Sequence, residues 1–238
     1  DLRLNILDKH VDYFVISEST KTHQGKEKKL NFNIKNFLKY KSKIKYIVAD
    51  YDKKIDFDNH TGGESPVEKH QRNQLIKGIK DASHDDLIIL SDSDEIPDLT
   101  KLQEINQNKK YIAFSQKMFM YKLNLQNLNE SNWIGSKITL KKNITTMQKL
   151  RDLKFKKYPF WRFDKIKDLQ IIKDGGWHFS YLQKPNDLIK KISSFSHGEH
   201  NKPEFANLEN IDKKIKKHEN IFGLNFSYKK IEVDDTFP

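Results

Sequence analysis

Residues 85–97 restrict the possible fold of this chain more than any other stretch, because an apolar run is followed there by a cluster of acids. The apolar half is short and rich in branched residues, which predicts a strand buried on both faces. Asp92, Asp94 and Glu95 follow it within four residues, and Pro97 then ends the strand. We therefore expect the acids at the carboxyl end of a buried strand, where ligands bind in open α/β sheets.

Carboxylates this close together repel one another unless a cation or hydrogen-bond donors hold them in the ionised state. In an extended segment Asp92 and Asp94 point to the same side, since side chains alternate with a period of two. Two hard oxygen ligands on one side suit Mg²⁺ or Mn²⁺, which would keep waters and take phosphate oxygens as further ligands. The alternative is a solvated acidic turn that caps the next helix, but the strand before it and the Glu-Ile-Pro after it favour a metal–diphosphate site.

The segment Ser-Asp-Ser-Asp-Glu-Ile-Pro at residues 91–97 resembles the signature of glycosyltransferase family seventeen, which includes the enzyme that adds bisecting N-acetylglucosamine to N-glycans. Two further stretches fit this family: residues 11–32, which contain Ile-Ser-Glu-Ser, and Gly-Gly-Trp-His-Phe-Ser-Tyr at residues 175–181. The resemblance runs in order over most of the chain. It implies a single-displacement, inverting glycosyltransferase that binds a nucleotide sugar.

The fold class expected is α/β, with residues 1–238 as a single domain. The resemblance implies a GT-A-like nucleotide-sugar-binding fold with a mostly parallel central sheet and flanking helices. Strands predicted at residues 111–123 and 133–140 would form a small antiparallel sheet beside it. The chain opens in a predicted helix, and family members carry a strand before it, so we expect that first strand to be missing. Residues 223–238 are predicted to be a loosely ordered tail.

Three polar side chains outside the acidic cluster are candidates for nucleotide-sugar binding. Glu18 follows a predicted strand and would bind donor or acceptor, or else cap its loop. Asp50 follows the next strand and resembles the family's nucleotide-recognition position, where it would accept from a uracil N–H; otherwise it is an ordinary loop residue. Arg72 lies on the inner face of a helix that begins at Ser65, where an arginine needs an acidic partner or a phosphate. The resemblance assigns Arg72 to the nucleotide-sugar pocket or to the acidic cluster, with a structural ion pair as the alternative.

The second motif adds two more candidates. The paired Gly175 and Gly176 permit a positive φ or a close backbone approach. His178 is expected to be a third metal ligand or a contact to the diphosphate, although a lone histidine is usually structural. Trp177 would stack on a sugar face as part of the nucleotide-sugar site, with a place in the core as the alternative.

Transfer of a sugar from a nucleotide diphosphate requires a neutralised leaving group and a base for the acceptor hydroxyl. Asp94 would hold the divalent ion, and Asp92 would reach the ribose or a metal-bound water. The resemblance places an acid at Glu199, which is therefore the first candidate for the general base. Asp174 is the second.

Residues 141–168 interleave basic and aromatic side chains, an arrangement that holds sugars by stacking and anions by charge, or nucleic acid by the same means. The alternative is a set of half-buried aromatic residues among solvated lysines. The net charge of the whole chain is +11, which attracts nucleic acid, anionic membrane or an anionic substrate. The lysines are scattered and no nucleic-acid-binding motif is present, so a nucleic-acid partner is not expected.

The sequence thus predicts a Mn²⁺- or Mg²⁺-dependent inverting glycosyltransferase, with a UDP-sugar donor, most simply UDP-N-acetylglucosamine, and a glycan or lipid-linked glycan acceptor. The basic surface predicts peripheral contact with anionic membrane. Absence of cysteine excludes disulfides and fits a reducing compartment. We expect the cytoplasm, at the inner membrane face, for a bacterial or viral origin, and the Golgi lumen for a eukaryotic one.

Two other classes of function remain open. A Mg²⁺-dependent phosphotransferase or nuclease would use the same acids on phosphate esters, but it would need more inward acids on neighbouring strands. A basic, non-catalytic nucleic-acid-binding module would bind with a strong salt dependence and would be indifferent to the loss of Asp94.

Overall fold

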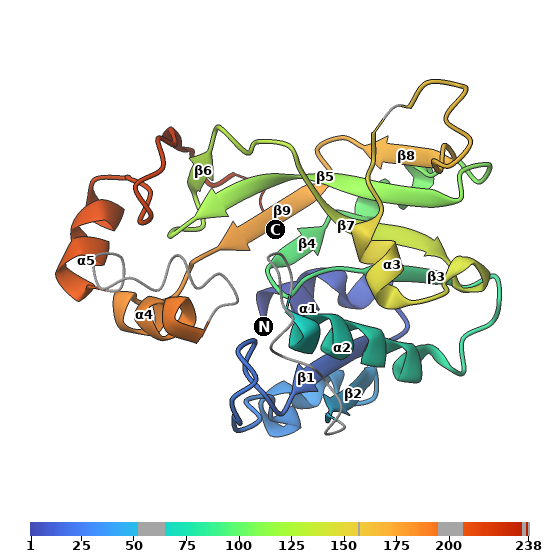
Figure 1. Cartoon of the computed structure of the whole chain (residues 1–238), viewed down its shortest axis with the longest axis horizontal. Coiled ribbons are helices and arrows are strands. Elements are labelled where there is room, and N and C mark those ends of the chain that lie inside the picture. The colour runs from blue at the N-terminus through green and yellow to red at the C-terminus, as the bar shows by residue number, and fades with distance from the viewer. Residues whose placement is uncertain (52–64, 157, 195–206, 235–236, 238) are drawn as a thin grey trace. The chain divides into compact units, whose positions relative to one another are not determined.

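The computed structural model describes residues 1–51, 65–156, 158–194, 207–234 and 237. The chain divides into two compact units. The first unit consists of Asp1, Val11–Lys80 and Tyr181–Tyr228, and the second of Leu2–His10, Asp81–Ser180 and Lys229–Pro238. Helices and strands occur in both (Figure 1), which confirms the α/β class.

The first unit is built on two parallel strands, β1 (Phe14–Ser19) and β2 (Ile44–Ala49), in a register that sets Ser19 beside Ala49. Parallel neighbours require a crossover connection, and here it contains the 3₁₀ helix η2 (Ile34–Tyr40). Non-helical backbone at Phe37 interrupts this helix.

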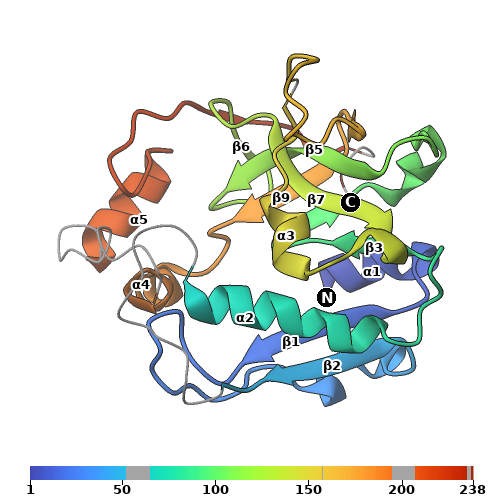
Figure 2. The ribbon, with the colours of Figure 1, turned by 45° about the vertical axis from the view of Figure 1, so that its right-hand side comes forward.

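Two consecutive helices pack on this pair of strands: α2 (Pro66–Gln74) and the 3₁₀ helix η3 (Leu75–Ile79) each contact both β1 and β2. Figure 2 shows α2 running along the strands. Ser65 Oγ accepts a hydrogen bond from Glu68 N at 3.1 Å, and Pro66 occupies the first helical position. The predicted helix start is therefore confirmed. The later helices of this unit are α4 (Pro185–Ser194) and α5 (Leu208–Lys216).

The second unit is organised around the long strand β5 (Tyr111–Met120), which is buried along nearly its whole length. It pairs antiparallel with β6 (Leu125–Asn127) and β7 (Trp133–Leu140), and parallel with β8 (Leu169–Ile172) and β9 (Gly176–Ser180). The sheet is completed by β3 (Leu87–Leu90), β4 (Glu95–Pro97) and β10 (Tyr228–Lys230).

The remaining helical segments of the second unit are short. They are α1 (Leu2–Leu7), η1 (Asp8–His10), η4 (Leu99–Glu104), η5 (Lys141–Asn143) and α3 (Met147–Asp152). The core beneath them includes the fully buried side chains of Phe114, Phe119, Leu125, Ile138 and Met147. No helix in the described part of the chain is long and apolar enough to cross a membrane.

The predicted mostly parallel central sheet is not confirmed. The larger sheet is mixed, because β3 pairs antiparallel with β7, and β4 pairs antiparallel with β9. The small sheet, β1 with β2, is the parallel one. The four-residue connection between β5 and β6 is too short for a crossover and returns the chain in the opposite direction, which forces antiparallel pairing. The strand before the acids is also less buried than predicted: Leu90 is buried, but Leu87 is 49% exposed.

The two neighbouring glycines let β9 continue beside β5 after β8 ends. Gly176 has a φ of +123°, and a Cβ there would lie 2.2 Å from the carbonyl oxygen of Ile96. A Cβ on Gly175 would lie 2.8 Å from the ring of Phe114. The predicted need for a positive φ or a close backbone approach is therefore confirmed.

Candidate active site

The acids of the first motif occupy a turn between β3 and β4. Glu95 N donates a hydrogen bond to the carbonyl oxygen of Asp92 at 3.1 Å, which closes the turn, and Glu95 then begins β4. The assumption that this segment is extended was therefore wrong. The side chains of Asp92 and Asp94 have different partners, although both remain about one-third exposed.

Asp92 is paired with an arginine from α3. Arg151 Nη2 donates to Asp92 Oδ2 at 2.8 Å and lies 3.9 Å from Glu95 Oε1. The position of Arg151 is fixed by Lys137 of β7, whose Nζ donates to the carbonyl oxygens of Arg151 and Leu153 at the end of α3. Charged donors at this end of a helix satisfy carbonyl groups that have no intrahelical partner.

The backbone of the turn is held by Arg3 of α1. Arg3 Nη1 donates to the carbonyl oxygens of Asp92, at 2.5 Å, and of Glu95, at 2.6 Å. Burial lowers the pKa of Arg3, and the charges of Glu95, Asp92 and Asp94 oppose that shift. Since arginine stays protonated in proteins, the turn has a permanent cation beneath it.

Glu95 is the buried member of the cluster, with 1% of its surface exposed. Its Oε1 accepts from Trp133 Nε1 at 2.8 Å, and its Oε2 accepts from Asp92 N at 3.1 Å. Burial, followed by the charge of Asp92, raises the pKa of Glu95, while Arg151 and the indole N–H partly oppose the rise. The hydrogen bonds make Glu95 a support for the turn, and its burial separates it from any ligand that approaches through solvent.

Asp94 lies beside the histidine of the second motif. Glu95 and His178 are register partners on β4 and β9, which brings His178 Nε2 to 3.4 Å from Asp94 Oδ2. The ring of Trp133 lies 4.8 Å from the ring of His178. His178 is buried, and its Nδ1 has no hydrogen-bond partner among the described residues. The two motifs therefore meet in space, as predicted from the sequence.

We tested whether these side chains suit a divalent ion. Among the described residues, no group of three His, Cys, Asp or Glu side chains is arranged to hold a metal, so Asp92, Asp94 and His178 do not form a three-ligand set. Mg²⁺-type sites on phosphate substrates commonly use only one or two carboxylates, with water and phosphate oxygens as the other ligands. The partly exposed oxygens of Asp92 and Asp94 fit such a site in their chemistry.

In the first unit, Glu18 has a full set of donors. Its Oε1 accepts from Lys28 Nζ and Asn31 N, both at 2.7 Å, and its Oε2 accepts from Phe32 N and Tyr46 Oη, both at 2.9 Å. Burial alone would raise the pKa of Glu18, but these hydrogen bonds outweigh it and the pKa is lowered. Burial and the bond to Glu18 raise the pKa of Tyr46 to about 12. These contacts favour the loop-capping alternative for Glu18.

Asp50 lies at the same end of the parallel strands as Glu18. Its Oδ1 accepts from Tyr51 N at 2.9 Å and from Thr20 Oγ1 at 3.3 Å. Arg72 is buried, as predicted, and its Nη2 lies 3.1 Å from Glu68 Oε1, one turn earlier on α2. The contact with Glu68 favours a structural ion pair for Arg72.

The other predicted site residues lie just before β9, on it or after it in the sequence. Trp177 is half-buried and pairs with Ile96 of β4 and Lys117 of β5. Asp174 is exposed, has a φ of +47°, and lies 3.8 Å from Lys117 Nζ. Glu199 lies outside the described residues, so its role as general base stays a prediction.

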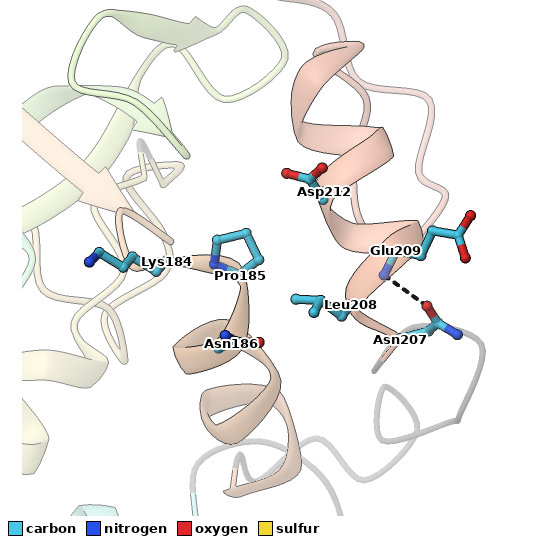
Figure 3. Close-up of a pocket in the computed structure, with 7 residues that line it drawn as sticks. All are labelled: Lys184, Pro185, Asn186, Asn207, Leu208, Glu209 and Asp212. Carbon is cyan, nitrogen blue, oxygen red and sulfur yellow. Dashed lines mark hydrogen bonds between the residues drawn. The ribbon is translucent and has the colours of Figure 1, made fainter.

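A pocket of about 860 Å³ lies in the first unit between the starts of α4 and α5 (Figure 3). It is lined by Lys184, Pro185, Asn186, Asn207, Leu208, Glu209 and Asp212. Asn207 Oδ1 caps α5 by accepting from Glu209 N at 2.9 Å. None of the predicted site residues lines this pocket.

Sequence reasoning did not assign a role at the acidic turn to Arg3, Trp133 or Arg151. Arg3 and Trp133 are distant in the sequence from both motifs, and no local pattern marks them. Arg151 was counted among the scattered basic residues of the aromatic stretch. The one available signal was the repulsion expected among three neighbouring acids, which required cations from elsewhere in the chain.

Comparison with known proteins identifies the family. The model of glycosyltransferase family 17 matches residues 1–234, so the chain belongs to this family and is a glycosyltransferase enzyme. No curated protein and no solved structure matches the chain.

Proposed function

We propose that this family 17 glycosyltransferase transfers a sugar, most simply N-acetylglucosamine, from a UDP-sugar to a hydroxyl of a glycan or lipid-linked glycan, with inversion at the anomeric carbon. The proposal places donor binding at the turn formed by residues 92–95. The observation that carries it is the arrangement of this turn, in which Asp92 and Asp94 are partly exposed and Glu95 and two arginines support them from below.

Asp94 and Asp92 would hold a divalent ion, Mn²⁺ or Mg²⁺, and His178, whose Nε2 lies 3.4 Å from Asp94 Oδ2, would orient the carboxylate of Asp94. The ion, when bound, would neutralise the negative charge that develops on the leaving diphosphate. Arg151 restrains Asp92, and Arg3 holds the backbone of the turn, so the carboxylates are positioned before the donor arrives. Such preorganisation is what charge stabilisation in a transition state requires.

The remaining roles follow the sequence assignments. Asp50 would accept from the uracil N–H, with its Oδ1 already oriented by Tyr51 N, and Trp177 would stack on a sugar face. Glu18 and Arg72 are proposed to shape the nucleotide-sugar pocket through the loop and helix that they hold in place. Glu199 would remove the proton from the acceptor hydroxyl, and Asp174 is the second candidate for that role.

The decisive experiment measures binding of UDP and UDP-N-acetylglucosamine by calorimetry, with and without Mn²⁺, for the parent protein and for Asp94→Asn. Metal-dependent binding that is lost in Asp94→Asn supports the proposal. The matched control is Asp164→Asn, which removes an exposed carboxylate of the same unit, paired with Arg162 and Lys165. This control should bind as the parent does.

Two outcomes would contradict the assignment. If no UDP-sugar binds in the presence of Mn²⁺, the donor assignment fails, and other nucleotide sugars become the next ligands to test. If UDP binds equally well to the parent and to Asp94→Asn, a nucleotide site exists but the acidic turn is not part of it.

A further inference from the structure

Three large aromatic side chains on one loop of the second unit are exposed to solvent. Phe160, Trp161 and Phe163 are 78%, 61% and 89% exposed, respectively, although folded proteins usually bury such side chains. They belong to the segment of residues 158–168, which we name the aromatic segment. Figures 1 and 2 show the chain between α3 and β8 leaving the sheet as a loop.

The backbone of the aromatic segment forms tight turns that present these rings outward. Arg162 N donates to the carbonyl oxygen of Pro159 at 3.1 Å, and Phe163 N donates to that of Trp161 at 3.0 Å. The rings of Phe160 and Trp161 meet edge to face, with their centroids 5.1 Å apart. The exposed rings therefore belong to a locally ordered structure with its own hydrogen bonds.

Basic side chains surround the rings. Lys167 Nζ donates to the carbonyl oxygen of Phe160 at 2.5 Å and lies 5.3 Å from the centre of the Phe163 ring. Lys165 Nζ lies 6.0 Å from the centre of the Tyr158 ring. Residues 153–168 contain six basic residues against two acidic ones. The loop thus combines an apolar, aromatic surface with an excess of positive charge.

This combination matches the chemistry of an anionic lipid surface. Tryptophan favours the boundary between headgroups and acyl chains, where its apolar face and its N–H are both satisfied, and phenylalanine supplies the apolar face of segments that lie in this boundary. Lysine ammonium groups next to them can reach lipid phosphates while their alkyl stems stay with the rings. Aromatic insertion and charge attraction together give stronger binding than either one alone.

The polar groups of the segment fit a glycan or a nucleic acid less well. Arg162 donates from Nε and Nη2 to the two oxygens of Asp164, both at 2.7 Å, so its guanidinium is already engaged. Lys165 Nζ also lies 3.0 Å from Asp164, but an ammonium group has three N–H donors, so Lys165 can still contact a phosphate. A sugar site would need polar groups aimed at the sugar hydroxyls beside the ring, whereas these groups are directed at one another.

We propose that the aromatic segment inserts Phe160, Trp161 and Phe163 into the headgroup region of an anionic membrane, with Lys165 and Lys167 contacting lipid phosphates. The proposal concerns attachment to a lipid surface and does not depend on the donor sugar or on a metal. Its failure can therefore be distinguished from failure of the proposed transfer reaction, which is tested by nucleotide binding at the acidic turn.

The experiment measures sedimentation of the full chain with vesicles of phosphatidylcholine alone and with added phosphatidylglycerol. We expect binding to the anionic vesicles, and at least a roughly tenfold loss of binding in F160S/W161S/F163S. The matched control is Y13S/L38S, which removes two large side chains of the first unit that are 57% and 64% exposed, and it should bind as the parent does. Circular dichroism and thermal melting verify that each variant is folded.

A second measurement locates the contact. The chain has three tryptophans, so the change in emission on vesicle binding is assigned by comparing the parent with Trp161→Phe. We expect Trp161→Phe to retain binding but to lose most of the blue shift. K165Q/K167Q should weaken binding to anionic vesicles and leave the weak interaction with phosphatidylcholine unchanged.

Three results would overturn the proposal. The parent protein does not sediment with anionic vesicles, the triple aromatic variant binds them as tightly as the parent, or binding is the same for neutral and anionic vesicles. A change of Trp161 emission produced by a soluble oligosaccharide or by single-stranded RNA, but not by vesicles, would assign the segment to that ligand instead.

Discussion

Arg151 donates a hydrogen bond of 2.8 Å from Nη2 to Oδ2 of Asp92, and so joins the end of α3 to the acidic turn. The same guanidinium lies 3.9 Å from the buried carboxylate of Glu95. One arginine therefore compensates two acids. Removal of one partner of a largely buried charge pair leaves the other without compensation, which is strongly destabilising.

The first prediction concerns this arginine. Arg151→Met should lower the free energy of unfolding by about 2 kcal/mol, because Asp92 and Glu95 lose their shared cation. Arg151→Lys should recover only part of the loss, since an ammonium group cannot reproduce the guanidinium geometry. Urea unfolding monitored by circular dichroism provides the values.

The control for Arg151 is Arg162→Met, in which the lost partner is the exposed Asp164. Exposed ion pairs contribute little to stability, so this variant should unfold as the parent does. Equal destabilisation of the two variants would mean that Arg151 has no special role at the turn.

The second prediction uses the buried lysine behind Arg151. Burial, followed by the charge of Arg151, lowers the pKa of Lys137 from 10.5 to about 8. Between about pH 8 and 10.5 the unfolded chain therefore binds more protons at Lys137 than the folded chain does. The contribution of Lys137 to the free energy of unfolding consequently rises with pH over this range. Below pH 8 both states are protonated, and the full cost of burying the charge is present.

Lys137→Met abolishes this dependence. The parent should gain stability relative to Lys137→Met by about 2 kcal/mol between pH 7 and pH 10, because a shift of one pKa unit corresponds to about 1.4 kcal/mol. Urea unfolding of both proteins over this range measures the difference, in which the titration of the other lysines cancels. A difference that stays constant with pH, or that falls as pH rises, would show that Lys137 has an ordinary pKa.

The third prediction compares two glycines that both have positive φ. Gly176→Ala should lower the free energy of unfolding by at least about 2 kcal/mol, because the new Cβ would meet the carbonyl oxygen of Ile96 at 2.2 Å in addition to the backbone strain. Gly223→Ala would introduce the backbone strain alone, since the atom nearest to the new Cβ would be 4.0 Å away. Its free energy of unfolding should therefore fall by only about 1 kcal/mol. Thermal melting of both variants would contradict the packing argument if the two losses were the same.

The fourth prediction concerns Glu18 and the loop that it holds. In Glu18→Gln, the new side-chain NH₂ group would face N–H and O–H groups that are themselves donors. We therefore expect the free energy of unfolding to fall by about 1–2 kcal/mol at pH 7. The matched control is Glu27→Gln, in the same loop, where the carboxylate is 75% exposed and pairs with Lys21. That variant should unfold as the parent does.

The pH dependence provides a second test of Glu18. Its pKa is lowered in the folded state, so its contribution is present above the usual glutamate pKa and is lost as pH falls through the folded value. The stability difference between the parent and Glu18→Gln should therefore shrink when unfolding is measured in steps from pH 7 to pH 3. A difference that grows on acidification would contradict the assignment.

Local patterns predicted local structure well. Alternating and branched residues located β2 at residues 44–49, and the cap at Ser65 with Pro66 located the start of α2. The glycine pair before β9 was interpreted correctly, because a tight approach of two backbones excludes any side chain. At the start of α2 the interacting residues, Ser65 and Glu68, are only three positions apart, whereas for the glycines the residue type alone indicates the close approach.

Contacts between distant residues could not be predicted in the same way. The mixed sheet depends on the pairing of β3 with β7 and of β5 with four other strands, which no local pattern specifies. The turn at Asp92 replaced the expected extended segment because Arg3, 89 residues earlier, binds the carbonyl oxygen that the turn presents. Sequence reasoning identified the acids correctly as a cluster that needs cations, but it could not locate those cations.

The bond between Arg3 and the acidic turn also bears on the order in which the second unit can mature during synthesis. The helix that carries Arg3 is made before the turn, because the two carbonyl oxygens that it binds belong to residues 92 and 95. Until the ribosome has released residue 95, that guanidinium has no turn to hold, and the carboxylates have no permanent cation beneath them. Assembly of the candidate catalytic centre on the nascent chain therefore cannot precede the synthesis of residue 95, and the pairing of Asp92 with Arg151 must wait until α3 has been made.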